Sequence, residues 1–167
     1  DVTKPEDCAA LIALAIEKYG RVDILVNNAG VGTAVPATHE TPDQYRSVIE
    51  TNLMGSYWMA QEFAKANKDG GAIVNISSVL GLKPQGLPQA AYASSKAGVI
   101  GLTRDLAAQW TGRKNIRVNA LAPGFFPSEM SDELPKDMVN MIKMFTPAGR
   151  LGDPEELAAT LIWLVSD

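Results

Sequence analysis

Three short segments rich in apolar residues divide the chain and are predicted to be strands, and the first is an unalternating apolar run, typical of a strand that is buried on both faces. They are residues 24–26, 73–76 and 116–121. Apolar residues recur at helical spacing in the intervening segments, over residues 8–19, 41–67 and 91–111. Strands and helices therefore alternate. This order predicts an α/β fold: a doubly wound, Rossmann-like parallel sheet with helices on both faces.

Capping signals mark where the expected helices begin and end. Thr3 with Glu6, and Thr41 with Gln44, have the spacing of capping boxes. Gly20 follows the first helix, in the position where glycine commonly ends one. After an irregular stretch, residues 138–145 have the pattern of a short amphipathic helix, and the sequence Asp-Pro-Glu-Glu at 153–156 caps a last helix.

Polar or turn-forming residues follow each expected strand. They are Asn27-Asn28, Ser77-Ser78 and Pro123-Gly124. The carboxyl ends of parallel strands share one edge of a sheet, and ligands of such sheets bind beyond that edge. The three clusters are therefore expected to converge on a binding site.

A tyrosine and a lysine stand one helical turn apart in the segment Tyr92-Ala-Ser-Ser-Lys96, so both side chains should lie on one helix face. A phenol ionises near pH 10, and a nearby positive charge lowers that pKa. The sequence therefore predicts that Lys96 tunes Tyr92 as a general acid or base. The alternative is an aromatic residue and a lysine that merely share a face.

The candidate groups hold protons but cannot store electrons. Ser78 and Tyr92 together could hold and polarise one substrate oxygen, and a hydride would have to come from a cofactor. A serine hydrolase is disfavoured, because the only histidine, His39, lies in a polar loop, and Ala93 occupies the serine position of an S-x-x-K motif. No Cys/His cluster has the spacing of metal ligands, so no metal site is expected.

Composition narrows the class of protein. The 167 residues, 46% of them hydrophobic, suit one domain with a substantial core. The net charge of −4, with no basic run, argues against a nucleic-acid partner. The single cysteine, Cys8, fits a reducing, cytoplasmic location. We expect Cys8 to pack as a small apolar residue of a helix in the core. No apolar run is long enough to span a membrane.

The motifs taken together resemble the short-chain dehydrogenase/reductases, over essentially the whole chain. They are Asn27-Asn28-Ala29-Gly30, Asn52, Ser78, Tyr92-x-x-x-Lys96 and Pro123-Gly124. The Asn-Asn-Ala-Gly turn is similar to that of the compact, single-domain branch. The resemblance implies that Tyr92 exchanges the proton, that Ser78 holds the substrate oxygen, and that Lys96 contacts the nicotinamide ribose. Asn52 would anchor a water in a proton relay; the alternative is an asparagine that only packs at a helix kink.

The resemblance also implies the cofactor contacts, beyond those of Tyr92 and Lys96. Asp1 and Val2 would lie along the adenine, Asn28 near the ribose, and the backbone of Gly124, Phe126 and Ser128 near the carboxamide. The segment from Ser78 to Tyr92 is one residue longer than the commonest family spacing, which leaves Ser77 as the alternative catalytic serine. Ser128 stands where the family usually has threonine.

The family's glycine-rich phosphate loop, Thr-Gly-x-x-x-Gly-x-Gly, does not occur in these residues. NAD and NADP therefore cannot be distinguished as the cofactor. The sequence also does not begin with methionine. We expect residues 1–167 to be a partial NAD(P)-binding domain, incomplete at both ends and inactive by itself.

The expected activity is hydride transfer between a nicotinamide cofactor and a ketone or secondary alcohol. Apolar residues where the family has its substrate lid favour a 3-oxoacyl type of substrate: Phe125, Phe126, Met130, Met138 and Met141. The alternatives are a polyol or sugar dehydrogenase and a non-catalytic interaction domain. The resemblance further implies a homodimer or homotetramer, assembled through the helices expected at 41–67 and 91–111.

Overall fold

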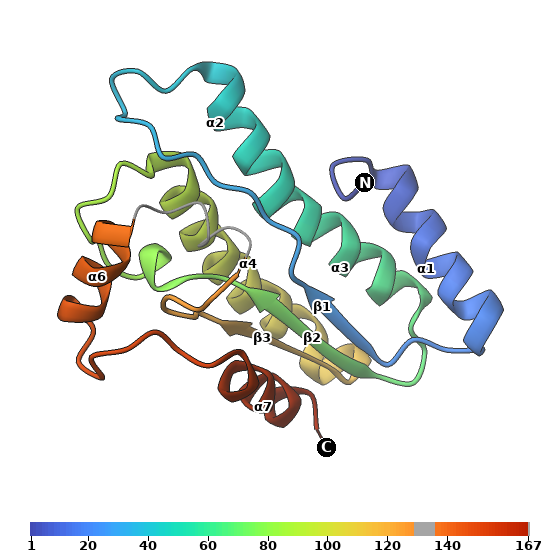
Figure 1. Cartoon of the computed structure of the whole chain (residues 1–167). Helices are drawn as coiled ribbons and strands as arrows, with labels where there is room; N and C mark the ends of the chain where they lie inside the picture. Colours follow the sequence, from blue (N-terminus) through green and yellow to red (C-terminus); the bar gives the residue numbers. More distant parts are fainter. Residues whose placement is uncertain (129–135, 167) are drawn as a thin grey trace. The chain divides into compact units, whose positions relative to one another are not determined.

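A parallel sheet of three strands forms the centre of the first part of the chain. The computed structural model describes residues 1–128 and 136–166, which fall into two compact units, Asp1–Ala122 and Pro123–Asp167. In the first unit, β1 (Ile24–Asn27), β2 (Gly71–Ile76) and β3 (Ile116–Leu121) pair in the order β1-β2-β3 (Figure 1). All three predicted strands and the α/β class with a parallel sheet are confirmed. The prediction that β1 is buried on both faces is wrong, since Ile24 and Val26 on one face are 47% and 38% exposed.

One α-helix of the first unit precedes β1, and the others lie between successive strands. In chain order, these helices are α1 (Pro5–Tyr19), α2 (Pro42–Ile49), α3 (Gly55–Ala66) and α4 (Ala90–Lys114). Figure 1 shows α2 and α3 as one continuous rod, and a π-helical segment, η1 (Glu50–Met54), joins them. A 3₁₀ turn, η2 (Val79–Gly81), follows β2. The single helix predicted over residues 41–67 therefore contains a π segment, and Asn52 lies in it.

The predicted helix caps are partly correct. Thr41 and Gln44 form the expected capping box, and Gly20 ends α1 with a left-handed backbone at φ 80°. The capping box predicted at Thr3 and Glu6 is wrong. Lys4 is the N-cap of α1 and makes no side-chain cap, because the Thr3 hydroxyl donates to the Asp1 carboxylate at 2.9 Å instead.

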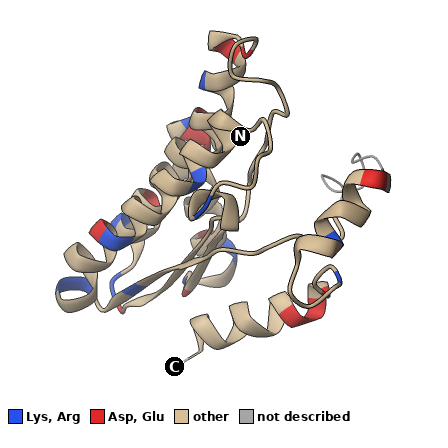
Figure 2. Ribbon diagram, turned by 90° about the vertical axis from the view of Figure 1, so that its left-hand side faces the viewer, with Lys and Arg blue, Asp and Glu red and all other residues tan. Residues whose placement is uncertain are grey.

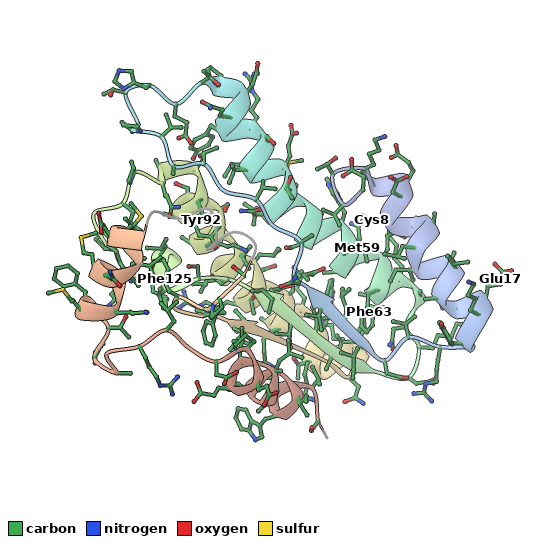
Figure 3. All side chains as sticks on the ribbon, viewed as in Figure 1. Cys8, Glu17, Met59, Phe63, Tyr92 and Phe125 are labelled. Carbon is green, nitrogen blue, oxygen red and sulfur yellow. The ribbon has the colours of Figure 1, made fainter. Side chains whose placement is uncertain are left out.

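The core of the first unit lies between one face of the sheet and the helices α1, α3 and α4. The strands contribute Leu25, Ile73 and Val118, which are partners in the sheet register. The helices contribute Cys8, Ile12, Met59, Phe63 and Leu106, and Figure 3 shows the labelled Cys8, Met59 and Phe63 on the adjacent α1 and α3. The predicted core role of Cys8 is confirmed, since it is 1% exposed.

The second unit contains α6 (Lys136–Phe145) and α7 (Pro154–Val165). Asp153 caps α7 as predicted, in a capping box with Glu156. The Phe126 ring packs against Gly152, where a Cβ atom would collide with it. Of the lid residues, Met138 lies on α6, Met141 is 44% exposed, and Met130 is outside the described residues.

Charged residues of both signs are interspersed along the helices rather than gathered into one stripe (Figure 2). Ion pairs among the described residues join exposed or partly exposed groups, for example Arg150 with Glu156. Over residues 1–128 and 136–166, no helix is both long and apolar enough to cross a bilayer.

Candidate active site

The carboxyl ends of β1 and β2 meet at one edge of the sheet. Asn27, the last residue of β1, is the register partner of Asn75, and Ile76 ends β2 one residue later. The exposed turn at Asn28-Ala29 and the Ser77-Ser78 pair therefore leave the sheet at this same edge, as predicted. The third predicted cluster, Pro123-Gly124, belongs to the second unit.

A buried chain of hydrogen bonds fixes this edge. The Asn27 side-chain amide donates to the Asn75 side chain at 2.8 Å and to the Ser56 carbonyl on α3 at 3.0 Å. Asn75 in turn donates to the Thr103 hydroxyl on α4 at 2.9 Å. Strand ends and both helices are therefore tied together by satisfied polar groups, which specify a unique arrangement more strictly than apolar packing does.

Tyr92 and Lys96 lie side by side in the first two turns of α4, as their spacing predicts. The Lys96 Nζ is 5.6 Å from the centroid of the Tyr92 ring, within range of a cation–π interaction. Lys96 is 4% exposed, and its Nζ donates to the Ile76 carbonyl at 2.7 Å. The ammonium is therefore held between the end of β2 and the tyrosine.

Burial controls the proton affinity of both groups. It lowers the pKa of Lys96 from its ordinary value of 10.5 to about 8. Burial also raises the pKa of the Tyr92 phenol, and a hydrogen bond with the Ser78 side chain opposes that rise without cancelling it. The net pKa of Tyr92 in this structure is therefore raised and not lowered as predicted, since loss of hydration outweighs the Ser78 hydrogen bond.

Two adjacent serines have different partners. Ser78 caps η2 by accepting from the Leu80 N–H at 3.1 Å, and its side chain hydrogen-bonds Tyr92. Ser77 instead donates to the Lys96 main-chain carbonyl at 2.8 Å and is 2% exposed. The geometry therefore favours Ser78 over Ser77 as the substrate-facing hydroxyl.

Glycines let two segments approach α4 closely. A Cβ on Gly32 would lie 3.3 Å from the Tyr92 ring, and one on Gly30 would lie 3.4 Å from the Lys96 Nζ. A Cβ on Gly81, in η2, would lie only 2.7 Å from the main chain of Lys96. The Ser-Val-x-Gly pattern after β2 is thus explained by close backbone packing.

The Asn52 side chain is occupied by protein partners. Its Oδ1 accepts from the Val31 N–H at 2.8 Å, and its Nδ2 donates to the Val31 carbonyl at 2.9 Å and to Ser95 Oγ at 3.0 Å. Both hydrogens of the Asn52 side-chain amide are therefore used. A water could be held by a carbonyl oxygen of Asn52, but not by its side-chain NH₂ group. The Asn52 side chain packs within the π-helical segment, and its role in a water relay stays a prediction.

Sequence reasoning missed Gln89, which stands three residues before Tyr92. Its Oε1 is buried and has no hydrogen-bond partner among the described residues. Gln89 is the N-cap of α4 but makes no side-chain cap. The sequence does indicate an unusual helix start here, because no Ser, Thr, Asp or Asn stands at the N-cap position of α4.

The predicted cofactor residues are spread over both units. Val2 packs against Gly55 at the start of α3, the Asp1 carboxylate accepts from Thr3, and Asn28 is exposed beyond β1. Gly124, Phe126 and Ser128 belong to the second unit, so their cofactor contacts stay predictions. Across residues 1–128 and 136–166, no cluster of His, Cys, Asp and Glu side chains could hold a metal ion.

A family model described as enoyl-(acyl carrier protein) reductase matches residues 1–167. A 3-oxoacyl-[acyl-carrier-protein] reductase of Thermotoga maritima is 39% identical over the whole chain, which covers 68% of that protein. The chain belongs to the short-chain dehydrogenase/reductase family. An acetoacetyl-CoA reductase of this family, from Shinella zoogloeoides, is 41% identical, and the chain covers 70% of it.

Solved structures of short-chain dehydrogenase/reductases share the fold. A gluconate 5-dehydrogenase from Burkholderia cenocepacia, crystallised with NADP and tartrate, superimposes with a TM-score of 0.93 at 34% identity. That superposition covers 99% of this chain and 66% of the dehydrogenase. The chain thus spans about two thirds of the length of these relatives.

Proposed function

We propose that the protein is an NAD(P)-dependent oxidoreductase that interconverts a ketone and a secondary alcohol. The observation that carries this proposal is the cluster of Ser78, Tyr92 and Lys96 at the carboxyl edge of the sheet. A protein that had kept the fold only as an interaction domain would have no need of a buried lysine beside a tyrosine, since an unpaired buried charge is destabilising.

In the reducing direction, the Ser78 and Tyr92 hydroxyls hold the substrate carbonyl oxygen. The Tyr92 phenol gives its proton to that oxygen, and a nicotinamide cofactor, when bound, would be the source of the hydride that the carbonyl carbon needs. Lys96 stabilises the phenolate that remains, because its ammonium lies beside the ring. Oxidation of the alcohol is the reverse, with the Tyr92 phenolate as the general base.

The residues present fit a nicotinamide cofactor at this edge. The exposed turn at Asn28-Ala29 follows β1, and Lys96 lies within reach of the same turn at Gly30. Tyr92 and Lys96 would lie near the nicotinamide and its ribose, Asn28 near a cofactor ribose, and Asp1 and Val2 along the adenine. The contacts of Gly124, Phe126 and Ser128 with the cofactor stay predictions. Either NAD or NADP is compatible with these residues, although the gluconate 5-dehydrogenase structure contains NADP.

The proposed substrate is a 3-oxoacyl thioester or a similar, largely apolar carbonyl compound. Both curated relatives described above are reductases of 3-oxoacyl groups, by their names. The likeness to gluconate 5-dehydrogenase favours a polyol or sugar acid as the second candidate. Self-association through α2, α3 and α4 stays a prediction.

The test uses the full-length protein and the Tyr92→Phe variant. Acetoacetyl-CoA and gluconate-type polyols are offered with NADH or NADPH, or with the oxidised cofactors, and the absorbance of the reduced nicotinamide is followed. Loss of the phenol proton should lower kcat by at least about a hundredfold. Tyr45→Phe, a change at a 40% exposed tyrosine of α2, serves as the matched control and should retain activity.

Retained turnover in Tyr92→Phe would reject the proposed role of the tyrosine. A strong preference for polyols over 3-oxoacyl thioesters would replace the first substrate class by the second.

A further inference from the structure

A fully buried serine connects Tyr92 to a separate helix. The Ser95 Oγ donates to the main-chain carbonyl of Tyr92 at 2.8 Å and accepts from Asn52 Nδ2 at 3.0 Å. Ser95 is 0% exposed and Asn52 is 1% exposed, so the hydrogen bond between their side chains is shielded from water. The hydroxyl thus links α4 to the π-helical segment η1.

The connection continues from Asn52 to the turn after β1. The Asn52 amide pairs with both the N–H and the carbonyl of Val31, at 2.8 and 2.9 Å. Val31 stands between the two glycines that approach Lys96 and the Tyr92 ring. These contacts hold Tyr92 from two sides. Ser95 hydrogen-bonds the backbone of Tyr92, and the Val31 segment, which is bound by Asn52, packs against the Tyr92 ring.

Only one of the two hydrogen bonds of the Ser95 hydroxyl is explained by its position within a helix. Serine hydroxyls often donate to a carbonyl three or four residues earlier in a helix, and the bond to Tyr92 is of that kind. The bond accepted from Asn52 is different, because it comes from another element and saturates a buried amide donor. The neighbouring Ser94 is exposed and faces away from these contacts.

We propose that Ser95 is a positioning residue, which sets where the Tyr92 phenol stands by coupling it through Asn52 to the Val31 segment. This inference rests on the proposed function. Ser95 itself does not touch the reacting atoms, since its hydroxyl meets the main-chain carbonyl of Tyr92 and not the phenol.

The kinetic test compares Ser95→Ala with the matched control Ser94→Ala in the full-length protein. Displacement of a catalytic group by about 1 Å can cost a hundredfold in rate. We expect Ser95→Ala to lower kcat by about tenfold to a hundredfold with KM changed by less than about threefold, because a displaced phenol weakens proton transfer in the transition state more than it weakens the hydrogen bond to the substrate oxygen in the ground state. Ser94→Ala should match the wild type in both constants.

A double-variant cycle tests the route of the coupling. Asn52→Ala removes the other end of the same link, so the Ser95→Ala/Asn52→Ala protein should lose no more rate than the worse single variant. Losses that multiply would show that the two residues act independently, and this would overturn the proposed coupling.

A spectroscopic readout separates this inference from the proposed function. The protein is labelled with 3-fluorotyrosine, and the ¹⁹F resonance of residue 92 is assigned with Tyr92→Phe. Ser95→Ala should shift that resonance and move its titration towards lower pH, since a loosened phenol is better hydrated. Ser94→Ala should change neither.

The outcomes are distinguishable. A wild type without oxidoreductase turnover refutes the proposed function, while the fluorine readout still decides whether Ser95 positions Tyr92. An active wild type with a Ser95→Ala variant indistinguishable from Ser94→Ala in kcat and in the residue 92 resonance overturns the inference alone. If Ser95→Ala lowers only the melting temperature and leaves the kcat of the folded protein unchanged, the role is purely structural and the inference is again overturned.

Discussion

The burial of Lys96 should be measurable as a pH-dependent destabilisation of the fold. Its pKa falls from 10.5 to about 8 because the ammonium is removed from water. At about 1.4 kcal/mol for each pH unit, holding this charge at neutral pH costs roughly 3 kcal/mol of folding free energy. Lys96→Met keeps the length of the side chain and removes the charge.

A second effect of the substitution acts in the opposite direction. The Nζ–H bond to the Ile76 carbonyl is lost, and leaving that carbonyl without a partner costs about 1–3 kcal/mol. This cost is nearly independent of pH, since a neutral amine also donates. The free energy of unfolding of Lys96→Met at a single pH therefore combines both effects. How the difference from the wild type changes with pH gives the cost of the buried charge alone.

The sign follows from proton counting. Below pH 8 the native and unfolded chains both hold the Lys96 proton, whereas between about 8 and 10.5 only the unfolded chain holds it. Because the unfolded state binds more protons in that window, the free energy of unfolding of the wild type rises with pH. Relative to Lys96→Met, the wild type should gain about 2 kcal/mol between pH 8 and 9.5.

Urea unfolding of the full-length proteins at several pH values from 7 to 9.5 provides the measurement. Lys18→Met, at an exposed lysine of α1, controls for the loss of a surface charge and should track the wild type at every pH. The reasoning is refuted if the difference in free energy of unfolding between wild type and Lys96→Met stays constant from pH 7 to 9.5. Lys96 would then have the same pKa in the native and unfolded states.

Two further results are expected. The kcat/KM for carbonyl reduction should fall as pH rises through about 8, because Lys96 loses the charge that stabilises the Tyr92 phenolate. In Lys96→Arg, which stays protonated, this fall in kcat/KM should occur at higher pH. If pH–rate profiles show the fall at the same pH in both proteins, Lys96 is not its source. Gln89→Leu should leave the free energy of unfolding unchanged or raise it by up to about 1 kcal/mol, since Oε1 already lacks a partner. A loss of more than about 1 kcal/mol in urea unfolding would show that this oxygen is in fact satisfied.

The order and type of the main elements could be predicted from apolar patterning. Val74 and Ile73 belong to a run without alternation, and a strand with both faces covered is the simplest structure for such a run. The Thr41–Gln44 box and Gly20 mark helix ends by local chemistry that no distant contact overrides. For the same reason, the Tyr92–Lys96 proximity could be predicted, because helix geometry alone determines it.

Features that depend on distant partners could not be predicted. Thr3 has the spacing for a cap, but the Asp1 carboxylate competes for its hydroxyl. The π segment around Asn52 has no local sequence signature, and it forms where the Asn52 amide pairs with Val31 and Ser95 from two other parts of the chain. Such polar contacts across elements override helix propensity, as tertiary context commonly does.

The pKa of Tyr92 shows most clearly what sequence spacing leaves open. A lysine one turn away predicts a lowered pKa, yet the phenol is buried by the Gly32 segment and by its own helix, and burial raises its pKa. At neutral pH the pair therefore holds a protonated phenol beside a largely protonated lysine. Within the proposed function, this state is ready to give a proton to a carbonyl oxygen, whereas alcohol oxidation must first remove the phenol proton against its raised pKa. Within the proposed function, the rate of alcohol oxidation should therefore rise with pH as more of the Tyr92 phenol ionises.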